Sequence, residues 1–227
     1  IMSSLPRIFS ASTSKFVLLA IPFFILAGNI MEKAGISERL IHLADTCVGH
    51  VKGGLAIVCV VVACFFGAIS GSGPATVAAL GCVLIPAMIT QGGFTAAFSS
   101  ALMATASSIA IVIPPSIAFV VYASITGVSI ADMFTAGIVP GILMGVALVA
   151  VVMIEVRKQG IESTQEKSSA KERWDAFKDA FWGLLMPVII LGGIYGNVFC
   201  VLNFWLLGVT AQIAVRKSPK SAQTYMN

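Results

Sequence analysis

Apolar residues dominate this chain in long runs, and charged residues are confined to short stretches between them. Residues 53–131 contain no Asp, Glu, Lys, Arg or His. A helix that crosses a bilayer needs about 20 mostly apolar residues, so this run alone is long enough for about three or four crossings or re-entrant passages. Residues 16–31, 133–154 and 180–215 are further uncharged runs. The pattern predicts an all-α polytopic membrane protein.

The polar segment at residues 32–52 has apolar side chains at helical spacing, namely Ile36, Leu40, Leu43 and Cys47. This spacing is typical of an amphipathic helix that lies at a membrane interface. A solvated connector fits the same segment, and the sequence leaves both interpretations open.

The second polar segment, residues 155–179, carries equal numbers of acidic and basic side chains. Because Lys and Arg rather than net charge set the orientation of membrane proteins, we expect this connector to be cytoplasmic. Its aromatic residues share one helical face that would lie on the membrane, namely Trp174, Phe177 and Phe181. The chain thus divides into a transmembrane region at 1–154, a charged connector at 155–179 and the start of a second half at 180–227.

The composition excludes several classes of protein. Hydrophobic residues make up 58% of the chain and charged residues 11%, with a mean hydropathy of +0.97. A soluble domain carries about 25% charged residues, so soluble enzymes and nucleic-acid binders are excluded. The net charge of +4 reflects loop Lys and Arg residues that set topology rather than attract nucleic acid.

Gly and Pro cluster at four places inside the charge-free run, at residues 71–74, 86–93, 114–115 and 127. Irregular backbone is tolerated at membrane depth only where protein covers it or a cavity wets it. The clusters therefore favour broken helices over a bundle of straight ones.

The first cluster predicts a hairpin tip near residues 70–76. Pro74 has no N–H, so the Ser70 carbonyl would lose its helical donor, and Pro74 suits the first turn of a new helix. Carbonyls, hydroxyls and a helix N-terminus would gather there, and such a tip can bind a cation or a carboxylate. A kinked crossing whose Gly and Ser residues only pack helices remains the alternative.

The Pro114–Pro115 pair predicts a second break, near residues 107–116. The two prolines would remove the donors of the Ala110 and Ile111 carbonyls, and the break is expected near Ile113. Freed carbonyls beside serine hydroxyls make an all-oxygen site for a hard cation. A plain proline kink is the alternative.

Several chemistries find no support in the sequence. It has no phosphate-binding G-x-x-x-x-G-K-[ST] loop and no G-x-S-x-G nucleophile motif. His42 and His50 lie in a polar connector, and the five cysteines lack metal-ligand spacing, so we expect buried, small hydrophobic cysteines. An intramembrane enzyme would need an acid, His or Lys that the core lacks. We expect neither an enzyme nor an organic cofactor.

Five collinear motifs between residues 7 and 196 resemble the large membrane subunit of TRAP (tripartite ATP-independent periplasmic) transporters. They are A-I-P-F-F-I-L-A-G at 20–28, F-G-A-I-S-G-S-G-P-A-T at 66–76, I-P-P-S at 113–116, A-G-I-V-P-G at 136–141 and M-P-V-I-I-L-G-G-I-Y at 186–195.

The resemblance implies sodium-coupled uptake of organic acids, such as C4-dicarboxylates or sialic acids, across the bacterial inner membrane. It implies an elevator-type fold of inverted repeats, with sodium as the coupling ion. The implied partners are a small membrane subunit, a periplasmic substrate-binding protein and the surrounding membrane lipids.

The resemblance also implies site residues. The first-repeat sodium site would comprise Ser70, Gly71, Ser72, Gly73, Ser107, Ser108, Ala110 and Ile111. The substrate would contact Ser72, Pro74, Thr76, Pro115 and Ser116. The family often has Gly where this chain has Ala110.

The chain departs from the family pattern after Gly196. The family continues with an F-T-P-T-E-A-A type segment and a second repeat, whereas this chain reads Asn-Val-Phe-Cys and ends at Asn227. The first residue is not Met, and the head of the first repeat is missing from the pattern. We therefore expect a fragment or frame-disrupted product of a permease, with a truncated, non-transporting membrane remnant as the alternative function.

Overall fold

The computed structural model describes residues 25–26, 28, 35–160 and 168–195. Throughout these residues the regular elements are helices, which confirms the all-α prediction for this part of the chain. They are α3 (Ile36–Val48), α4 (Gly54–Ser70), α5 (Gly73–Thr90), α6 (Ala96–Val112), α7 (Ile117–Thr126), α8 (Ile130–Gln159) and α9 (Ala170–Tyr195). The uncharged run predicted at 16–31 and the chain after Gly196 lie largely or wholly outside the described residues.

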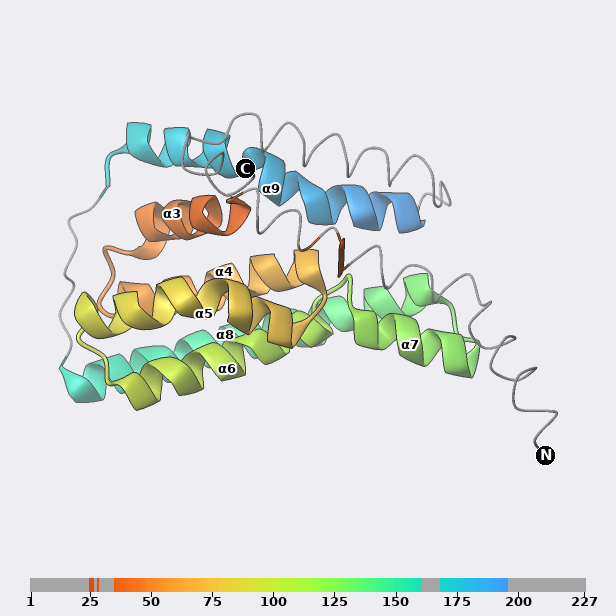
Figure 1. The fold of residues 1–227 in the computed structure, drawn as a ribbon, viewed down its shortest axis with the longest axis horizontal. Helices are drawn as coiled ribbons and strands as arrows, with labels where there is room; N and C mark the ends of the chain where they lie inside the picture. Colours follow the sequence, from red (N-terminus) through yellow and green to blue (C-terminus); the bar gives the residue numbers. More distant parts are fainter. Residues whose placement is uncertain (1–24, 27, 29–34, 161–167, 196–227) are drawn as a thin grey trace, which may run out of the picture.

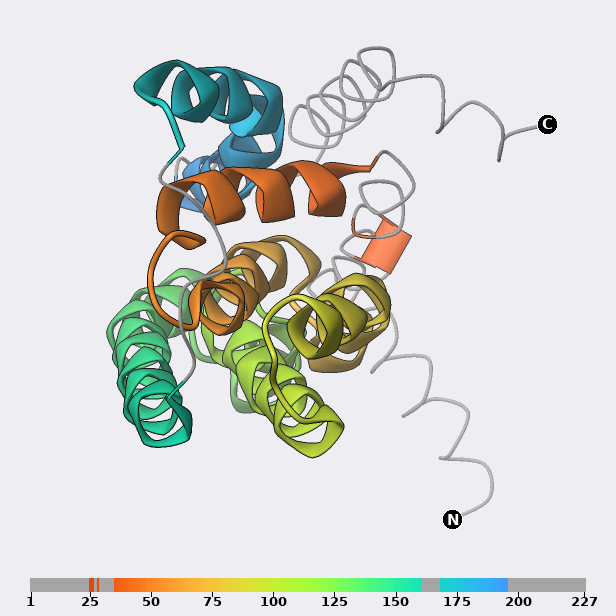
Figure 2. The ribbon, with the colours of Figure 1, turned by 90° about the vertical axis from the view of Figure 1, so that its left-hand side faces the viewer.

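Helix α4 lies at the centre of the assembly and packs against α3, α5, α6 and α8. Helices α4, α5, α6 and α8 run alongside one another, and α3 lies between them and α9 (Figure 1). Figure 2 shows α3 crossing the direction of these helices at a steep angle. Helix α4 is apolar on all sides, as a helix surrounded by others must be, and its side chains from Ala56 to Val60 are buried.

The helices have the lengths and surfaces of a membrane protein. Two of them, α5 and α8, are long and apolar enough to span a bilayer, and a third span results if the bent pair α6–α7 counts as one. Helix α8 exposes large apolar side chains along much of its length, such as Val139 at 65% and Leu143 at 63%. In water such a surface would be costly, whereas hydrocarbon solvates it without penalty.

Helix α3 confirms the helical prediction for part of the first polar segment. Ile36 and Leu40 are buried, Leu43 is half-buried, and the helix packs on α4 and α9. Cys47, which was expected on the apolar face, is exposed instead. The expectation of buried cysteines is confirmed for Cys59 and wrong for Cys82, which is also exposed on α5.

The third and fourth Gly and Pro clusters end helices, but Pro86 does not. Helix α5 continues through Pro86 to Thr90, and the chain turns only at Gln91, Gly92 and Gly93. Pro86 has no N–H, so the Cys82 carbonyl four residues earlier lacks its helical donor. The rest of the helix tolerates this one missing hydrogen bond. Helix α7 ends at Gly127 in the left-handed conformation, as its Gly predicts.

Helices extend into the charged connector from both of its ends. Helix α8 extends to Gln159, and α9 begins at Ala170 and runs through the boundary predicted at residue 179. The aromatic face is confirmed, because the rings of Trp174 and Phe177 stack with centroids 5.8 Å apart and Phe181 follows at 6.0 Å. All three rings are exposed.

Helices α4 and α6 cross where Gly67 lies against Ala110. A Cβ atom on Gly67 would fall 2.5 Å from the Ala110 Cβ and 2.6 Å from its Cα, distances that real Cβ atoms do not reach. Gly67 therefore allows backbone contact between the helices even though residue 110 is Ala.

This contact predicts opposite effects for two glycine substitutions within helices. Gly67→Ala should lower the free energy of unfolding by about 1–3 kcal/mol, because the methyl group has no room. Gly81→Ala is the matched control, since its Cβ would meet nothing closer than 3.5 Å and alanine favours a helix by up to about 1 kcal/mol. Thermal unfolding in detergent measures both, and equal melting temperatures for the two variants would contradict the crossing.

Candidate functional site

The connection between α4 and α5 is the predicted hairpin tip. Helix α4 ends at Ser70, Gly71 follows with φ of 61°, and Ser72 is extended before α5 begins at Gly73. Only a residue without a Cβ adopts this φ without cost, and Pro74 lies in the first turn of α5 as expected. The structure confirms the tip and its position.

Hydroxyl groups hold the tip in shape. The Thr76 hydroxyl donates to the Ser72 carbonyl at 2.9 Å and lies 3.2 Å from the Ser70 Oγ. The Ser72 N–H donates to the same Ser70 Oγ at 3.4 Å. Ser70 and Thr76 are buried, so this network is shielded from solvent.

The second break is also where the prolines predict it. Helix α6 ends at Val112, Ile113 is extended, and α7 begins at Ile117 after a bend of 40°. The Ser116 hydroxyl donates to the Ile111 carbonyl, one of the two carbonyls that the prolines deprive of a donor. The same oxygen accepts the Phe119 N–H and so caps α7.

The tip and the break lie against each other. The Ile117 N–H donates to the Gly71 carbonyl at 3.3 Å, across a gap of more than forty residues in sequence. A Cβ on Gly71 would fall 2.8 Å from the Pro115 carbonyl oxygen, and a Cβ on Gly73 would fall 3.1 Å from the Ser107 carbonyl oxygen. Glycine is therefore required at position 71, where φ is also positive, and a side chain at position 73 would be a tight fit. On the outer side of the tip, Gly28 lies in ordinary contact with Ser70.

Four helix ends consequently converge at one place, which we call the junction (residues 70–76 and 107–117). The carbonyl ends of α4 and α6 each carry about half a negative charge, and the amide ends of α5 and α7 each carry about half a positive charge. No ionisable Asp, Glu, Lys, Arg or His side chain lies in this part of the chain. Main-chain dipoles and hydroxyls therefore dominate the electrostatics of the junction.

The junction offers both kinds of binding group. A hydroxyl that donates its proton to a carbonyl still presents oxygen lone pairs, which can coordinate a cation. At α5 the helix N-terminus has no side-chain cap, and Pro74 in its first turn is exposed. An uncapped, exposed N-terminus has the charge and the N–H donors that suit an acidic group.

The structure gives the predicted residues different surroundings. It brings the tip glycines, Pro115, Ser116 and the main chain at Ser107 together, and the Ile111 side chain contacts Gly73. The Ser108 hydroxyl instead donates to the Thr105 carbonyl of its own helix at 2.6 Å on a more exposed side. Thr76 is fully buried and braces the tip rather than facing outward.

Sequence reasoning did not single out four groups that lie in the junction or pack against it. Gly67 belongs to a motif noted for other residues, and Ile117 directly follows the I-P-P-S motif, so only the fold shows what they touch. Gly137 and Gly141 lie in the A-G-I-V-P-G motif of α8, where their spacing of four residues was a signal for close helix packing.

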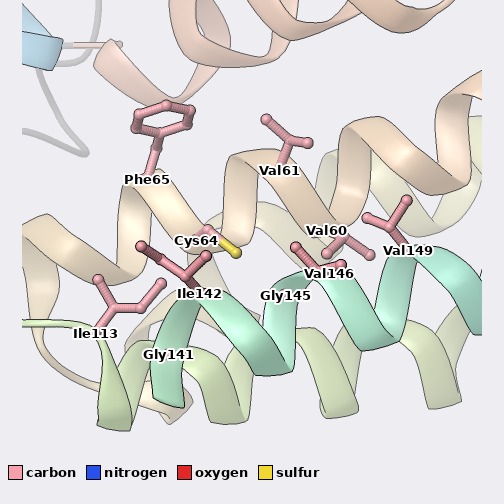
Figure 3. A pocket seen from close by; sticks show the side chains of 10 residues that line it. All are labelled: Val60, Val61, Cys64, Phe65, Ile113, Gly141, Ile142, Gly145, Val146 and Val149. Carbon is pink, nitrogen blue, oxygen red and sulfur yellow. The ribbon is translucent and has the colours of Figure 1, made fainter. Parts of the chain in front are cut away.

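An apolar groove of about 320 Å³ lies beside the junction, between α4 and α8 (Figure 3). It is lined by Val60, Val61, Cys64, Phe65, Ile113, Gly141, Ile142, Gly145, Val146 and Val149. No side chain here could pair with a carboxylate, and burying an unpaired charge is expensive. The groove is therefore not a site for an acidic substrate.

The sequence matches a known family over almost its whole length. The family described as "Tripartite ATP-independent periplasmic transporter, DctM component" matches residues 3–216.

Three curated relatives are similar at 41–46% identity. The C4-dicarboxylate TRAP transporter large permease protein DctM of Pseudomonas aeruginosa is 44% identical over 188 residues, which cover 83% of this chain and 44% of the relative. The isethionate TRAP transporter permease protein DctMQ of Oleidesulfovibrio alaskensis is 46% identical, covering 82% and 29%. The ectoine TRAP transporter large permease protein TeaC of Halomonas elongata is 41% identical, covering 92% and 49%.

The chain thus spans about half the length, or less, of the curated relatives it matches. The matched region contains both the hairpin tip and the broken helix. On the extent of the family match and on these identities, the chain belongs to the DctM family of TRAP transporter large permeases.

Proposed function

We propose that this chain supplies the first-repeat half of the transport site of a sodium-coupled permease for organic acids. The junction carries the proposal, through the direct contact between the hairpin tip and the broken helix at the Gly71 carbonyl and the Ile117 N–H. In this account the permease is a secondary transporter of the bacterial inner membrane, built from inverted repeats that move as an elevator.

Sodium would bind at the carbonyl side of the junction. The C-termini of α4 and α6 together contribute about one negative charge, and the surrounding ligands are oxygens, which suit a hard cation. Candidate ligands are the carbonyls at residues 70–73, 107 and 110–111, with the Ser70, Ser72 and Thr76 hydroxyls. Sodium is in this account a coupling ion and cargo, not a resident cofactor.

The organic acid would bind at the amide side, against the uncapped first turn of α5 at Ser72 and Pro74. Pro115 and Ser116 would form the facing wall, since they contact the tip at Gly71. The relatives' names include C4-dicarboxylate, isethionate and ectoine, so membership of the family does not fix one substrate. We propose a C4-dicarboxylate or a sialic-acid-like acid, delivered by a periplasmic binding protein.

A small membrane subunit completes the proposed assembly. The relative from Oleidesulfovibrio alaskensis carries the designation DctMQ, which supports a second membrane component beside the DctM part.

The charged connector would lie on the cytoplasmic side of the membrane, because basic residues at both of its ends favour that orientation.

The sodium site predicts an ion-specific effect on stability. Sodium chloride should raise the melting temperature of the chain in lipid nanodiscs above that in choline chloride at equal ionic strength. Binding at a hundred times the Kd stabilises a protein by about 2.7 kcal/mol. Thr76→Val, which removes one hydroxyl at nearly constant volume, should abolish most of this sodium-dependent increment.

Thr105→Val is the matched control for that measurement. The Thr105 hydroxyl makes the same kind of bond as Thr76, to the Ala101 carbonyl at 2.8 Å, but on the exposed side of α6. The control should keep the full sodium increment. A full increment in Thr76→Val, or none in the parent chain, would contradict the proposed site.

The orientation predicts the accessibility of Ser169, which is exposed at the start of α9. With the native cysteines replaced, Ser169→Cys should resist an impermeant thiol reagent applied to intact spheroplasts. It should react once the membrane is permeabilised, because the side chain is not buried. Rapid labelling of the intact spheroplasts would place the connector on the periplasmic side.

A further inference from the structure

The A-G-I-V-P-G motif of α8 lies outside residues 70–76 and 107–117, which form the junction. Its glycines continue as a row on one face of the helix, Gly137, Gly141 and Gly145, spaced four residues apart. All three are buried. Small residues at this spacing let a neighbouring segment approach the helix backbone closely.

Gly137 and Gly141 face the break between α6 and α7. A Cβ on Gly137 would fall 2.8 Å from the Val112 carbonyl oxygen and 2.3 Å from the Phe119 Cε2. A Cβ on Gly141 would fall 2.6 Å from the Ile113 Cγ1 and 3.4 Å from the Ile113 Cα. Helix α8 thus packs closely against Val112 and Ile113, directly before the prolines, and against the Phe119 ring of α7.

Gly145 has a different neighbour, and its surroundings leave room for a methyl group. Its Cβ would meet only the Cys64 Sγ of α4, at 3.4 Å, which is an ordinary contact. Figure 3 shows Ile113 beside Gly141 and Cys64 beside Gly145, one turn further along α8. The close approach is therefore specific to the two glycines opposite the break.

Aromatic packing also joins α7 to α8. The rings of Phe119 on α7 and Phe134 on α8 lie with centroids 6.5 Å apart, and Phe134 is fully buried. Helix α8 consequently contacts both halves of the broken helix. The unwound segment thus contacts both the tip glycine Gly71 and helix α8.

We propose that Gly137 and Gly141 are positioning residues that seat residues 112–117 against the hairpin tip. Closely packed interiors transmit a displacement instead of absorbing it. A side chain at either position would push the break toward or along the tip and move the Pro115 and Ile117 main-chain groups. The expected effect of this packing on sodium binding rests on the proposed function, whereas the packing of α8 against residues 112–117 does not.

The test measures the distance between the tip and the break directly. Spin labels are attached at Ala75→Cys on α5 and Ala118→Cys on α7, both exposed, in an otherwise cysteine-free chain in lipid nanodiscs. Double electron–electron resonance then gives the label distance. Gly141→Ala should shift or broaden the distribution relative to the parent. Gly145→Ala should leave it unchanged, the more so because Cys64 is replaced by Ala in this background.

A second variant keeps the proposal testable if Gly141→Ala does not fold. Ile113→Ala removes the atom that lies 2.6 Å from the new methyl group, so Ile113→Ala combined with Gly141→Ala should restore folding and the parent distance. A parent-like distance in Gly141→Ala alone would overturn the proposal. A combined variant that is no closer to the parent than Gly141→Ala would overturn it too.

The same samples separate this proposal from the proposed function. Their melting temperatures are recorded in sodium and in choline chloride, and Gly141→Ala should lose sodium stabilisation that Gly145→Ala keeps. A parent without any sodium stabilisation counts against the proposed function, while the label distances still decide whether α8 seats the break.

Discussion

The pairing of main-chain groups in a charge-free, apolar interior is the constraint on which the rest of this structure depends. Within the described residues, helices end at the α4–α5 tip and at the α6–α7 break, and each of these ends leaves carbonyl and N–H groups that hydrocarbon cannot satisfy. The chain resolves this by bringing the interruptions together. The Ile117 N–H finds the Gly71 carbonyl, and the Ser116 hydroxyl supplies the donor that Pro115 withholds from Ile111.

This arrangement requires backbones to touch, which explains the glycines around it. Gly67 brings α4 onto α6, Gly71 brings the tip onto Pro115, and Gly141 brings α8 onto Ile113. A methyl group at Gly67 or Gly71 would meet backbone atoms, and one at Gly141 would meet the Ile113 side chain, so each would disturb the junction. The hydroxyls that close the junction also leave lone pairs for a cation, so in the proposed function one set of groups would serve both stability and binding.

The sequence predicts those features that depend on local chemistry. A proline has no N–H and restricts the residue before it, so the ends of α6 at Val112 and α4 at Ser70 follow from the chain itself. The helical aromatic face of α9 follows from spacing alone. Pro86 shows the limit of such reasoning, because the same residue type inside α5 did not end the helix.

Features that depend on partners distant in sequence could not be predicted. Nothing in residues 70–76 states that the tip lies against Pro115, or that Thr76 faces inward while Ser108 bonds within its own helix. The role of Gly141 depends on Ile113, nearly thirty residues earlier, and their contact exists only once α8 has packed. Resemblance to a family marked these motifs as belonging together, and the fold supplies the physical reason.

The central claim is that a junction without fixed charge binds sodium and an organic acid together. A single helix N-terminus offers about half a positive charge, too little for a dicarboxylate, so sodium should raise substrate affinity and substrate should raise sodium affinity equally. The most direct measurement is calorimetric titration of a C4-dicarboxylate into the assembled transporter in sodium and in choline buffer. The account predicts binding only with sodium, and equal affinity in the two buffers would contradict it.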